Sequence, residues 1–401
     1  MNELITSSLA KLLQYIESED YKGYDPYDTL LSFIPFKKIG NWPAVLATQI
    51  QKRNPINIRP LLGIKKDYNP KAMGLFLQAY SLLYQKTNER RYLDKAEEIL
   101  NWLISNYSPG YSGYCWGYNF PWASPVKYVD ALVPSSVVTG FVCKGIYEYW
   151  KITKDSKSAM LINSASDFVL NDLPVTETKD GLCFSYTPVV KDMCYNSSLL
   201  AAEILCYNSI INKKLQNSVL ALKAIDFVIA KQLKDGKWNY SMDFNSGKER
   251  KQIDFHQGFV LESIHSIKSE LNIKCEIIDL SLKRGLEFYI NNQFDKTGVS
   301  LWRLPGKWPV DIHNQSQGII TFSKLSAYNN KFSDFVLKIA QWTIVNMQDP
   351  SGCFYFRINK TYTNRISYMR WSQAWMFLAL AVLICKSTQE DSENNSNYPL
   401  P

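Results

Sequence analysis

Residues 134–150 read PSSVVTGFVCKGIYEYW, and residues 195–211 read YNSSLLAAEILCYNSII. Both stretches are apolar on nearly every side of a helix, so each must be enclosed by other parts of the protein. Residues 92–107 are different, because an apolar stripe there leaves Asp94, Glu97 and Glu98 together on the opposite side. The sequence therefore predicts two classes of helix, one enclosed and one with a single wet face.

The two classes alternate along the chain. Helices with one charged face are predicted to begin near Leu4, Tyr92, Ser156, Lys214, Cys275 and Lys331. Enclosed helices are predicted to begin near Pro70, Pro134, Tyr195, Phe255, Ile312 and Trp371. Six helices of each class predict an all-α fold in which six helical hairpins form a closed ring, an (α/α)6 toroid with an inner and an outer layer.

A glycine followed by aromatic residues recurs between these helices about every 50 to 70 residues, which suits a hairpin repeat. These phrases begin at Gly113, Gly181, Gly236, Gly298 and Gly352, and a degenerate first copy lies near Gly63. Strand patterns are largely confined to the phrases, so we expect short β-like loops at one end of the ring. The repeat predicts one domain over residues 1–386, followed by a polar, disordered tail over residues 387–401.

The formal net charge of +8 comes from Lys and Arg residues that are interspersed with Asp and Glu. This mixing does not favour nucleic-acid binding, whereas an acidic glycan is a compatible partner. No stretch reaches the run of about 18 apolar residues that a spanning helix needs. Residues 1–19 predict an amphipathic helix rather than a signal peptide. The eight cysteines form no CxxC pair, so we expect reduced thiols and a cytoplasmic protein.

If the enclosed helices all run in the same direction, their N-termini and the aromatic loops open at one end of the ring. Two of these starts share an Asp-x-His pattern, Asp254-Phe255-His256 and Asp311-Ile312-His313, in a chain with only three histidines. The third, His265, lies within a helix, and we interpret it as structural. The predicted catalytic residues are Asp254, His256, Asp311, His313 and, in the loop before Pro134, Asp130.

Aromatic and polar residues near the same helix starts suit a carbohydrate, whose C–H faces stack on rings while its hydroxyls bind polar side chains. The predicted substrate-binding residues are Asp25, Asp28, Trp116, Tyr118, Trp122, Tyr195, Asn196, Trp238, Trp302, Arg370 and Trp371. A structural interpretation stays open for many of them. Buried aromatic residues are more often core than ligand platforms. Asp254 and Asp311 also suit helix N-caps, and Gln257 stands where a capping box needs it.

Two kinds of chemistry remain open. Glycoside cleavage commonly needs one ionised carboxylate and one carboxylic acid. A helix N-terminus favours the ionised form of Asp254 or Asp311, while Asp130, Asp25 and Asp28 are candidates for the acid. Uronate elimination or epimerisation instead needs a His or Tyr base, with an Arg or Asn that neutralises the sugar carboxylate. A non-catalytic glycan-binding or assembly protein is the main alternative to an enzyme, and a terpene or prenyl binder is a third.

Several segments carry a resemblance to known proteins: Tyr24-Asp25-Pro26-Tyr27-Asp28, Trp116-Gly117-Tyr118, Asp254-Phe255-His256-Gln257-Gly258-Phe259 and Asp311-Ile312-His313. The chain resembles the six-hairpin glycosidase superfamily, which includes glycoside hydrolases, sugar epimerases and toroidal domains of polysaccharide lyases. Over most of its length it is similar to proteins of bacterial capsule and exopolysaccharide gene clusters. The resemblance implies a carbohydrate-active protein of bacterial surface-polysaccharide biosynthesis or processing, with an oligosaccharide or polysaccharide as partner.

Other toroidal families fit less well. Squalene-type terpene cyclases carry a DxDD motif that this sequence lacks. Protein prenyltransferase β subunits and lanthionine cyclases hold zinc with Cys and His. Here Cys194 and His256 are followed by no further ligands at a recognisable spacing, so we expect no metal and no cofactor. We expect a monomer or weak oligomer.

Overall fold

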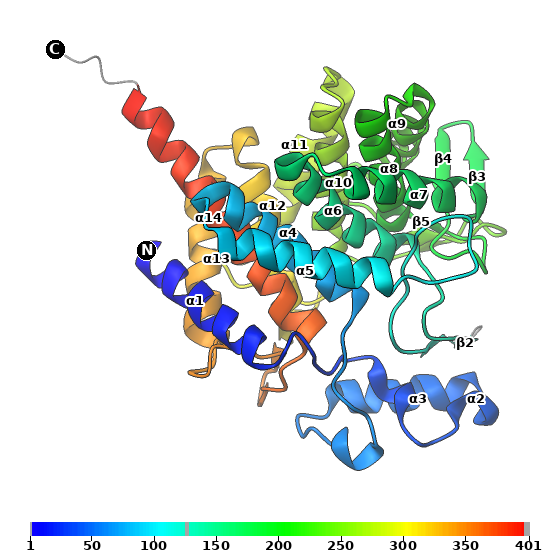
Figure 1. Cartoon of the computed structure of the whole chain (residues 1–401), viewed down its shortest axis with the longest axis vertical. Coiled ribbons are helices and arrows are strands. Elements are labelled where there is room, and N and C mark those ends of the chain that lie inside the picture. Colours follow the sequence, from blue (N-terminus) through cyan, green and yellow to red (C-terminus); the bar gives the residue numbers. More distant parts are fainter. Residues whose placement is uncertain (1, 125–127, 397–401) are drawn as a thin grey trace.

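The computed structural model describes residues 2–124 and 128–396, in which helices dominate (Figure 1). The inner helices are α4 (Pro70–Thr87), α6 (Ser136–Thr153), α8 (Tyr195–Asn212), α10 (His256–Glu270), α12 (Ile312–Lys324) and α14 (Trp375–Ser396). Each inner helix packs on the next, and α14 packs on α4, so these helices close into a ring. The predicted (α/α)6 toroid is confirmed.

An outer helix packs on each inner one. The outer helices are α1 (Asn2–Ser18), α5 (Arg90–Ser105), α7 (Ser156–Asn171), α9 (Leu215–Ala230), α11 (Glu276–Gln293) and α13 (Lys331–Met347). The two classes differ in burial as their sequences predict. In α8 every residue from Tyr195 to Ser209 is buried, whereas α5 buries only one stripe and leaves Asp94 and Glu97 in solvent.

The glycines of the aromatic phrases allow each hairpin to approach the next outer helix closely. Gly236 has a φ of +93°, and a Cβ atom there would lie 2.3 Å from the carbonyl oxygen of Arg284 on α11. Gly352 has a φ of +99°, and its Cβ would lie 2.2 Å from the carbonyl oxygen of Lys11 on α1. Only glycine fits both the left-handed backbone and this distance. The last phrase therefore packs on the first helix, which closes the outer layer.

A glutamine in the first turn of an inner helix holds the backbone of the preceding phrase. Gln257 accepts a hydrogen bond from the Trp238 amide at 2.9 Å, and Gln315 accepts one from the Ser300 amide at 2.7 Å. Gln373 does the same for the Phe354 amide at 2.8 Å. Gln257 therefore connects the aromatic phrase to the inner helix. The sequence suggested instead that Gln257 forms a capping box with Asp254, and the structure does not show this.

Trp116 and Trp238, two of the residues predicted to stack on a sugar, instead pack between the inner and outer helices. Trp116 and Trp238 are fully buried, and their indole N–H groups donate to the carbonyl oxygens of Leu103 and Val228 on outer helices. A ring enclosed on both faces cannot stack on a sugar. The prediction that these two tryptophans bind substrate is wrong, because the phrases that carry them fill the space between inner and outer helices.

The strands are short and antiparallel, and many lie just ahead of inner helices. The pairs are β1 (Trp122–Ala123) with β2 (Tyr128–Val129), and β3 (Val175–Thr178) with β4 (Gly181–Phe184). The three-stranded sheets join β5 (Met193–Cys194), β6 (Ser241–Met242) and β7 (Glu249–Arg250), and likewise β8 (Val310–Asp311), β9 (Arg357–Ile358) and β10 (Thr363–Asn364). They connect loops of neighbouring hairpins, so they hold the loop end of the ring together.

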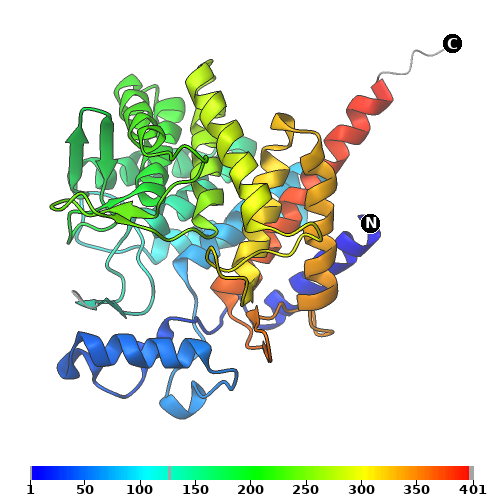
Figure 2. The same ribbon diagram turned by 180° about the vertical axis from the view of Figure 1, so that it is seen from behind.

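A lobe that the repeat pattern did not predict lies at one end of the ring in both views (Figures 1 and 2). It contains η1 (Asp28–Leu31), α2 (Phe36–Ile39), α3 (Asn41–Arg53) and η2 (Pro60–Leu62). The chain leaves α1, forms this lobe and returns to begin α4. Proline residues at 35, 55 and 60 lie at or next to the ends of its helices, and Pro43 lies in the first turn of α3, where proline is tolerated.

Toward the C-terminus, α14 extends to Ser396, so the tail predicted from residue 387 begins inside this helix. Residues 397–401 lie outside the described range. The division at residue 386 and the disorder beyond it therefore remain predictions. In the part of the chain that the structure describes, no helix has the length and apolar character that crossing a bilayer requires.

Candidate functional site

A cavity of about 570 Å³ lies where the inner helices begin. All of them contribute a residue from their first turns or from just before: Lys71, Val137, Asn196, His256, His313 and Arg370. The inner helices therefore run in the same direction, as the sequence predicted. On the opposite side, α3 contributes Thr48, Gln49 and Lys52, so the cavity lies between ring and lobe.

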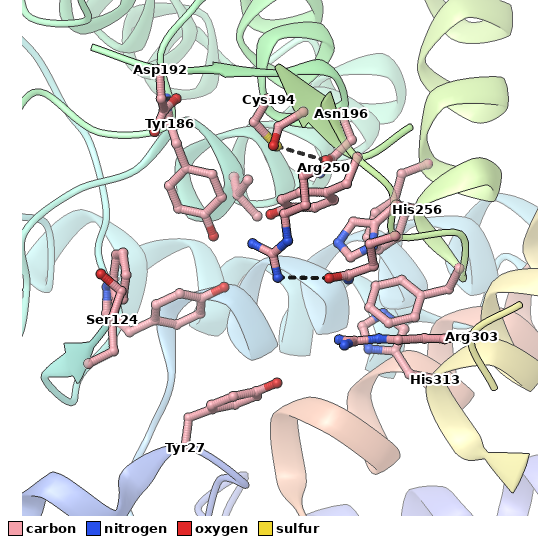
Figure 3. Close-up of a pocket in the computed structure, with 18 of the residues that line it drawn as sticks. Tyr27, Ser124, Tyr186, Asp192, Cys194, Asn196, Arg250, His256, Arg303 and His313 are labelled. Carbon is pink, nitrogen blue, oxygen red and sulfur yellow. Dashed lines mark hydrogen bonds between the residues drawn. The ribbon is translucent and has the colours of Figure 1, made fainter. Parts of the chain in front are cut away.

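Eight of the predicted site residues line this cavity: Tyr118, Trp122, Asn196, His256, Trp302, His313, Arg370 and Trp371. In the close-up, His256, His313 and Arg303 lie on one side, Tyr186 and Ser124 on the other (Figure 3). A π-helical turn, Met369–Ala374, directly precedes α14 and presents Arg370 and Trp371 to the cavity. Such wide turns are frequent at functional sites.

His256 is held by Asp254. The His256 Nδ1 atom lies 2.5 Å from the carboxylate oxygen Oδ1 of Asp254. Burial raises the pKa of Asp254, but the adjacent His256 and Arg303 outweigh it and hold that pKa at about 2. An ionised carboxylate only accepts hydrogen bonds, so His256 Nδ1 is the donor. In neutral His256 the other ring nitrogen, Nε2, then carries the lone pair that a general base needs.

His313 lies deeper, and neither of its ring nitrogens has a hydrogen-bond partner among the described residues. Its ring stacks on Phe255 at 4.2 Å between centroids, and Phe255 also stacks on His256 at 4.3 Å. Burial, reinforced by the charges of Lys71 and Arg370, holds the pKa of His313 well below its usual value. His313 is therefore neutral, with an N–H group that only a ligand or water can satisfy.

The other predicted carboxylates at this end do not line the cavity. Asp311 is fully buried, and it accepts hydrogen bonds from Arg357 Nε at 2.5 Å and Trp371 Nε1 at 2.9 Å. It also caps α12 by accepting the His313 amide at 2.9 Å. Asp254 is likewise buried behind His256. The prediction that these aspartates act directly on substrate is corrected, since they hold the groups that face the cavity.

Asp25 and Asp28 are also engaged behind the wall. Asp25 binds Arg370 through both carboxylate oxygens, at 2.6 and 2.8 Å. Asp28 binds Arg59 Nε at 2.6 Å, and both side chains are buried. Burial raises the pKa of Asp28 to about 6 despite this partner. Neither aspartate contacts the cavity, so Asp25 positions a cavity residue and Asp28 shapes the start of the lobe.

Two further predictions are wrong. Asp130 is largely exposed and forms an ion pair with Lys37 at 2.7 Å, outside the cavity. It lacks the dry surroundings that a proton donor requires. Tyr195 is fully buried and donates its hydroxyl to Glu249 at 3.0 Å, so it belongs to the core. The surroundings of Asp130 and Tyr195 depend on contacts with residues distant in the sequence, so the local sequence does not predict them.

The sequence missed most of the cations of the site. Six Lys or Arg side chains line the cavity, and only Arg370 was predicted: Lys52, Lys71, Lys248, Arg250, Arg303 and Arg370. The lining carboxylates are Asp192 and Asp243. Arg303 lies 3.3 Å from Asp254, and Arg370 is paired with Asp25. Within the described residues the other four cations form no ion pair, so the cavity carries unmatched positive charge.

Two of these cations are lysines that are almost fully buried. Lys71, in the first turn of α4, lies 4.2 Å from the centroid of Phe141. Lys52, from α3, contacts the Tyr27 hydroxyl and lies 4.0 Å from the centre of that ring. Burial holds the pKa of both ammonium groups well below the usual value, and neighbouring arginines add to the effect. An anion in the cavity would reverse this shift.

A sequence signal for some of these residues exists in retrospect. Lys71 stands in the first turn of an enclosed helix, as His313 does. Arg250 ends β7 and Arg303 lies in a loop, and both segments lead to such helices. No local signal marks Lys52, because the lobe alone brings α3 over the ring. In the described part of the chain, no three His, Cys, Asp or Glu side chains gather as metal ligands.

Comparison with known proteins rests on structure. No protein-family model and no curated protein sequence matches the chain. A cellobiose 2-epimerase from Bacillus thermoamylovorans is similar with a TM-score of 0.64 and 14% identity, over 80% of this chain and 88% of that one. An unsaturated glucuronyl hydrolase specific for heparin has a TM-score of 0.64 and 10% identity, over 97% of both chains.

An alpha-1,6-mannanase from Salegentibacter has a TM-score of 0.58 and 11% identity, over 81% of this chain and 90% of that one. Identities this low show a shared fold and not a shared activity. The chain has the toroid on which these carbohydrate-active proteins are built.

Proposed function

We propose that this chain is an enzyme that moves a proton at a carbon next to a carbonyl group of an anionic sugar, as an epimerase or isomerase does. One observation carries the proposal. An imidazole held by a carboxylate, His256, and a neutral imidazole without partners, His313, lie in one cavity with unpaired cations. Similar toroids that are named as a sugar epimerase and as a uronate hydrolase support a carbohydrate substrate.

In the proposed reaction, His256 Nε2 takes a proton from the carbon next to the carbonyl group, and the C–H electrons form an enolate. His313 donates a hydrogen bond from its neutral ring to the enolate oxygen. Cations of the cavity stabilise the developing negative charge. To give an isomer, the proton returns from His256 to the former carbonyl carbon, while the hydroxyl proton on the first carbon moves to the former carbonyl oxygen. To give an epimer, a solvent proton adds to the first carbon from its other face, and His256 releases its proton to solvent.

The charge of the cavity supports an anionic group on the substrate. Lys52 and Lys71 are buried without a carboxylate partner among the described residues, and burying unpaired charge is costly. Arg250 is exposed and adds a further cation to the lining. A sugar carboxylate, sulfate or phosphate would supply the missing charge. Hydrolysis by two carboxyl groups is less well supported, because Asp254, Asp311 and Asp25 are buried in ion pairs or hydrogen bonds behind the wall. The two carboxylates that do line the cavity are engaged locally: Asp192 accepts the Tyr186 amide, and Asp243 accepts the amide and hydroxyl of Ser246.

The biological setting is proposed from the sequence. The resemblance to capsule and exopolysaccharide proteins supports an acidic saccharide of a bacterial surface polysaccharide as substrate. The eight cysteines are free thiols, which supports a reducing, cytoplasmic setting.

The test is proton exchange in D2O. Uronate-containing and neutral oligosaccharides are incubated with the protein, and NMR follows loss of the C–H signal next to the carbonyl group. We expect exchange with acidic saccharides, and a loss of about 10²- to 10⁴-fold in His256→Asn. Thermal unfolding of that variant should stay within a few degrees of the wild type, because the Asn side-chain amide can take the place of His256 Nδ1 and still donate to Asp254.

The same samples distinguish the alternatives. New reducing ends without exchange would indicate hydrolysis, and an unsaturated uronate absorbance would indicate elimination. Tight glycan binding without any conversion would indicate the non-catalytic assembly protein. Each of these results contradicts the proposed proton transfer.

A further inference from the structure

The lobe presents an apolar surface to solvent. Trp42, Leu46 and Ile50 recur every four residues on α3 and are 67%, 62% and 60% exposed. The opposite face of α3 is buried and includes Thr48 and Lys52. The usual polarity of a surface helix is therefore reversed in α3, because its polar residues face the protein and its large apolar residues face solvent.

The apolar surface extends beyond α3. Of the 21 exposed large apolar side chains among the described residues, eight lie between residues 31 and 61: Leu31, Phe33, Ile39, Trp42, Leu46, Ile50, Ile56 and Leu61. The other exposed apolar residues are scattered over the loops and outer helices. Scattered apolar residues are ordinary on a protein surface, whereas a concentration of them in one lobe marks a candidate contact site. We call residues 31–61 the apolar lobe face.

The segment that carries this face contains basic residues and no acidic ones. No Asp or Glu occurs between Asp28 and Asp67, and this stretch holds seven Lys or Arg residues in a chain whose net charge is +8. Five of them are exposed: Lys37, Lys38, Arg53, Lys65 and Lys66. Lys37 and Lys66 are paired with Asp130 and Glu19 from outside this stretch, so Lys38, Arg53 and Lys65 are its exposed basic residues without an ion pair among the described residues.

We propose that the apolar lobe face is a docking surface for an anionic lipid bilayer. Tryptophan, phenylalanine and leucine inserted among headgroups, with lysine and arginine beside them, are what an interfacial helix needs. The inner face of α3 supplies Thr48, Gln49 and Lys52 to the cavity. A bilayer that holds the outer face of α3 thus places the cavity at the membrane surface. This inference does not depend on the proposed reaction.

Charge favours a bilayer over a second copy of the chain. In a two-fold symmetric dimer the same face contacts itself, so two acid-free, basic segments would be brought together. Like charges in contact disfavour that pairing. Anionic headgroups, by contrast, neutralise the basic residues while the acyl region covers the apolar ones.

Sedimentation of the full chain with lipid vesicles tests the proposal. Vesicles of phosphatidylcholine mixed with phosphatidylglycerol should carry the protein at least about tenfold better than phosphatidylcholine alone, because several basic residues act together. The combined change Trp42→Ser, Leu46→Ser and Ile50→Ser should lower binding about tenfold or more. Lys38→Glu with Arg53→Glu should lower it similarly, without touching the apolar residues.

The matched control removes the same kind of exposed residue from the outer helices: Leu215→Ser, Ile277→Ser and Val345→Ser. We expect this variant to bind like the wild type. Absence of wild-type binding to anionic vesicles, or equal loss in the lobe and control variants, would overturn the proposal. So would a dimer in analytical ultracentrifugation that the lobe variant converts to a monomer, because the face would then be an interface between copies.

Discussion

Two buried lysines on neighbouring inner helices, Lys71 on α4 and Lys144 on α6, have opposite electrostatic surroundings. Both ammonium groups lie over the ring of Phe141, at 4.2 Å and 5.5 Å from its centroid. Lys144 is paired with Glu203 at 3.1 Å and Glu262 at 3.3 Å, whereas Lys71 has no carboxylate partner in residues 2–124 and 128–396. One lysine belongs to a balanced network inside the ring, and the other faces the cavity.

The pKa values of Lys71 and Lys144 are shifted in opposite directions, as their surroundings require. Burial lowers the pKa of Lys144, but the two glutamates outweigh burial and raise it above the usual value. Burial lowers the pKa of Lys71 well below the usual value, and Arg370 adds to the effect. Glu262 is satisfied further by Lys324 at 2.6 Å. The paired Lys144 joins helices inside the ring, whereas the unpaired Lys71 faces the cavity in which we propose that an anionic sugar binds.

The largest effect is expected from Lys144→Met. This change leaves Glu203 and Glu262 buried without their shared cation, which should lower the free energy of unfolding by about 3–5 kcal/mol. Urea unfolding followed by circular dichroism measures it. A loss below about 1 kcal/mol would show that the network does not stabilise the ring, and the contrast with Lys71 would fail.

Lys71→Met is the matched change in the cavity. It removes an unpaired buried cation, so the free energy of unfolding should not fall. Binding of an acidic saccharide should weaken roughly 10- to 100-fold, since a hydrogen bond to a charged group contributes about 1.5–3 kcal/mol. Isothermal titration calorimetry measures the affinity. Unchanged affinity for acidic saccharides would remove Lys71 from the binding site.

The pH dependence of Lys71 follows from its lowered pKa. Over the range between its folded pKa and the usual 10.5, the unfolded chain binds more protons, so this group makes stability rise with pH. Binding of an anion should raise the pKa again and draw in a proton. Calorimetry in buffers with different ionisation enthalpies measures that uptake, and Lys71→Met should reduce it.

Asp254→Asn tests a paired group at the cavity wall. The wild-type carboxylate has a pKa near 2 against a usual value of 3.8, so it contributes about 2 kcal/mol above pH 3.8, and this is lost as the pH falls toward 2. The variant should therefore be less stable than the wild type at neutral pH and equal to it near pH 2. Asp130→Asn, at an exposed ion pair, is the control and should change little at either pH.

The smallest effect is expected from Trp302→Leu. Trp302 lines the cavity with the Arg357 guanidinium 4.2 Å from its ring, so it offers one face to a ligand. Loss of sugar stacking should weaken binding by about 0.5–1.5 kcal/mol, with little change in stability. Trp342→Leu, on outer helix α13, serves as the control. Equal weakening by both changes would show that Trp302 is not a stacking platform.

The sequence was sufficient to predict the ring and half of the site. The spacing of apolar residues distinguishes enclosed helices from helices with one solvent-exposed face, because that spacing lies within each helix itself. The Asp-x-His pattern marks the starts of two enclosed helices. Trp116 and Trp302 occupy similar aromatic phrases, yet one is fully buried and the other lines the cavity. Their difference arises from which neighbouring hairpin covers each phrase, and no local pattern contains that information.

The amino-acid sequence by itself determined six enclosed helices and placed two histidines at their starts, because helix burial and helix ends depend on nearby residues. That the enclosed helices run in the same direction was an assumption that the tertiary structure confirmed. Only the tertiary structure decided that Asp254, Asp311 and Asp25 lie behind the cavity wall, and that the lobe brings Lys52 over it. Charge pairing and burial depend on residues tens to hundreds of positions apart, as between Asp25 and Arg370. Such contacts exist only once the ring has closed.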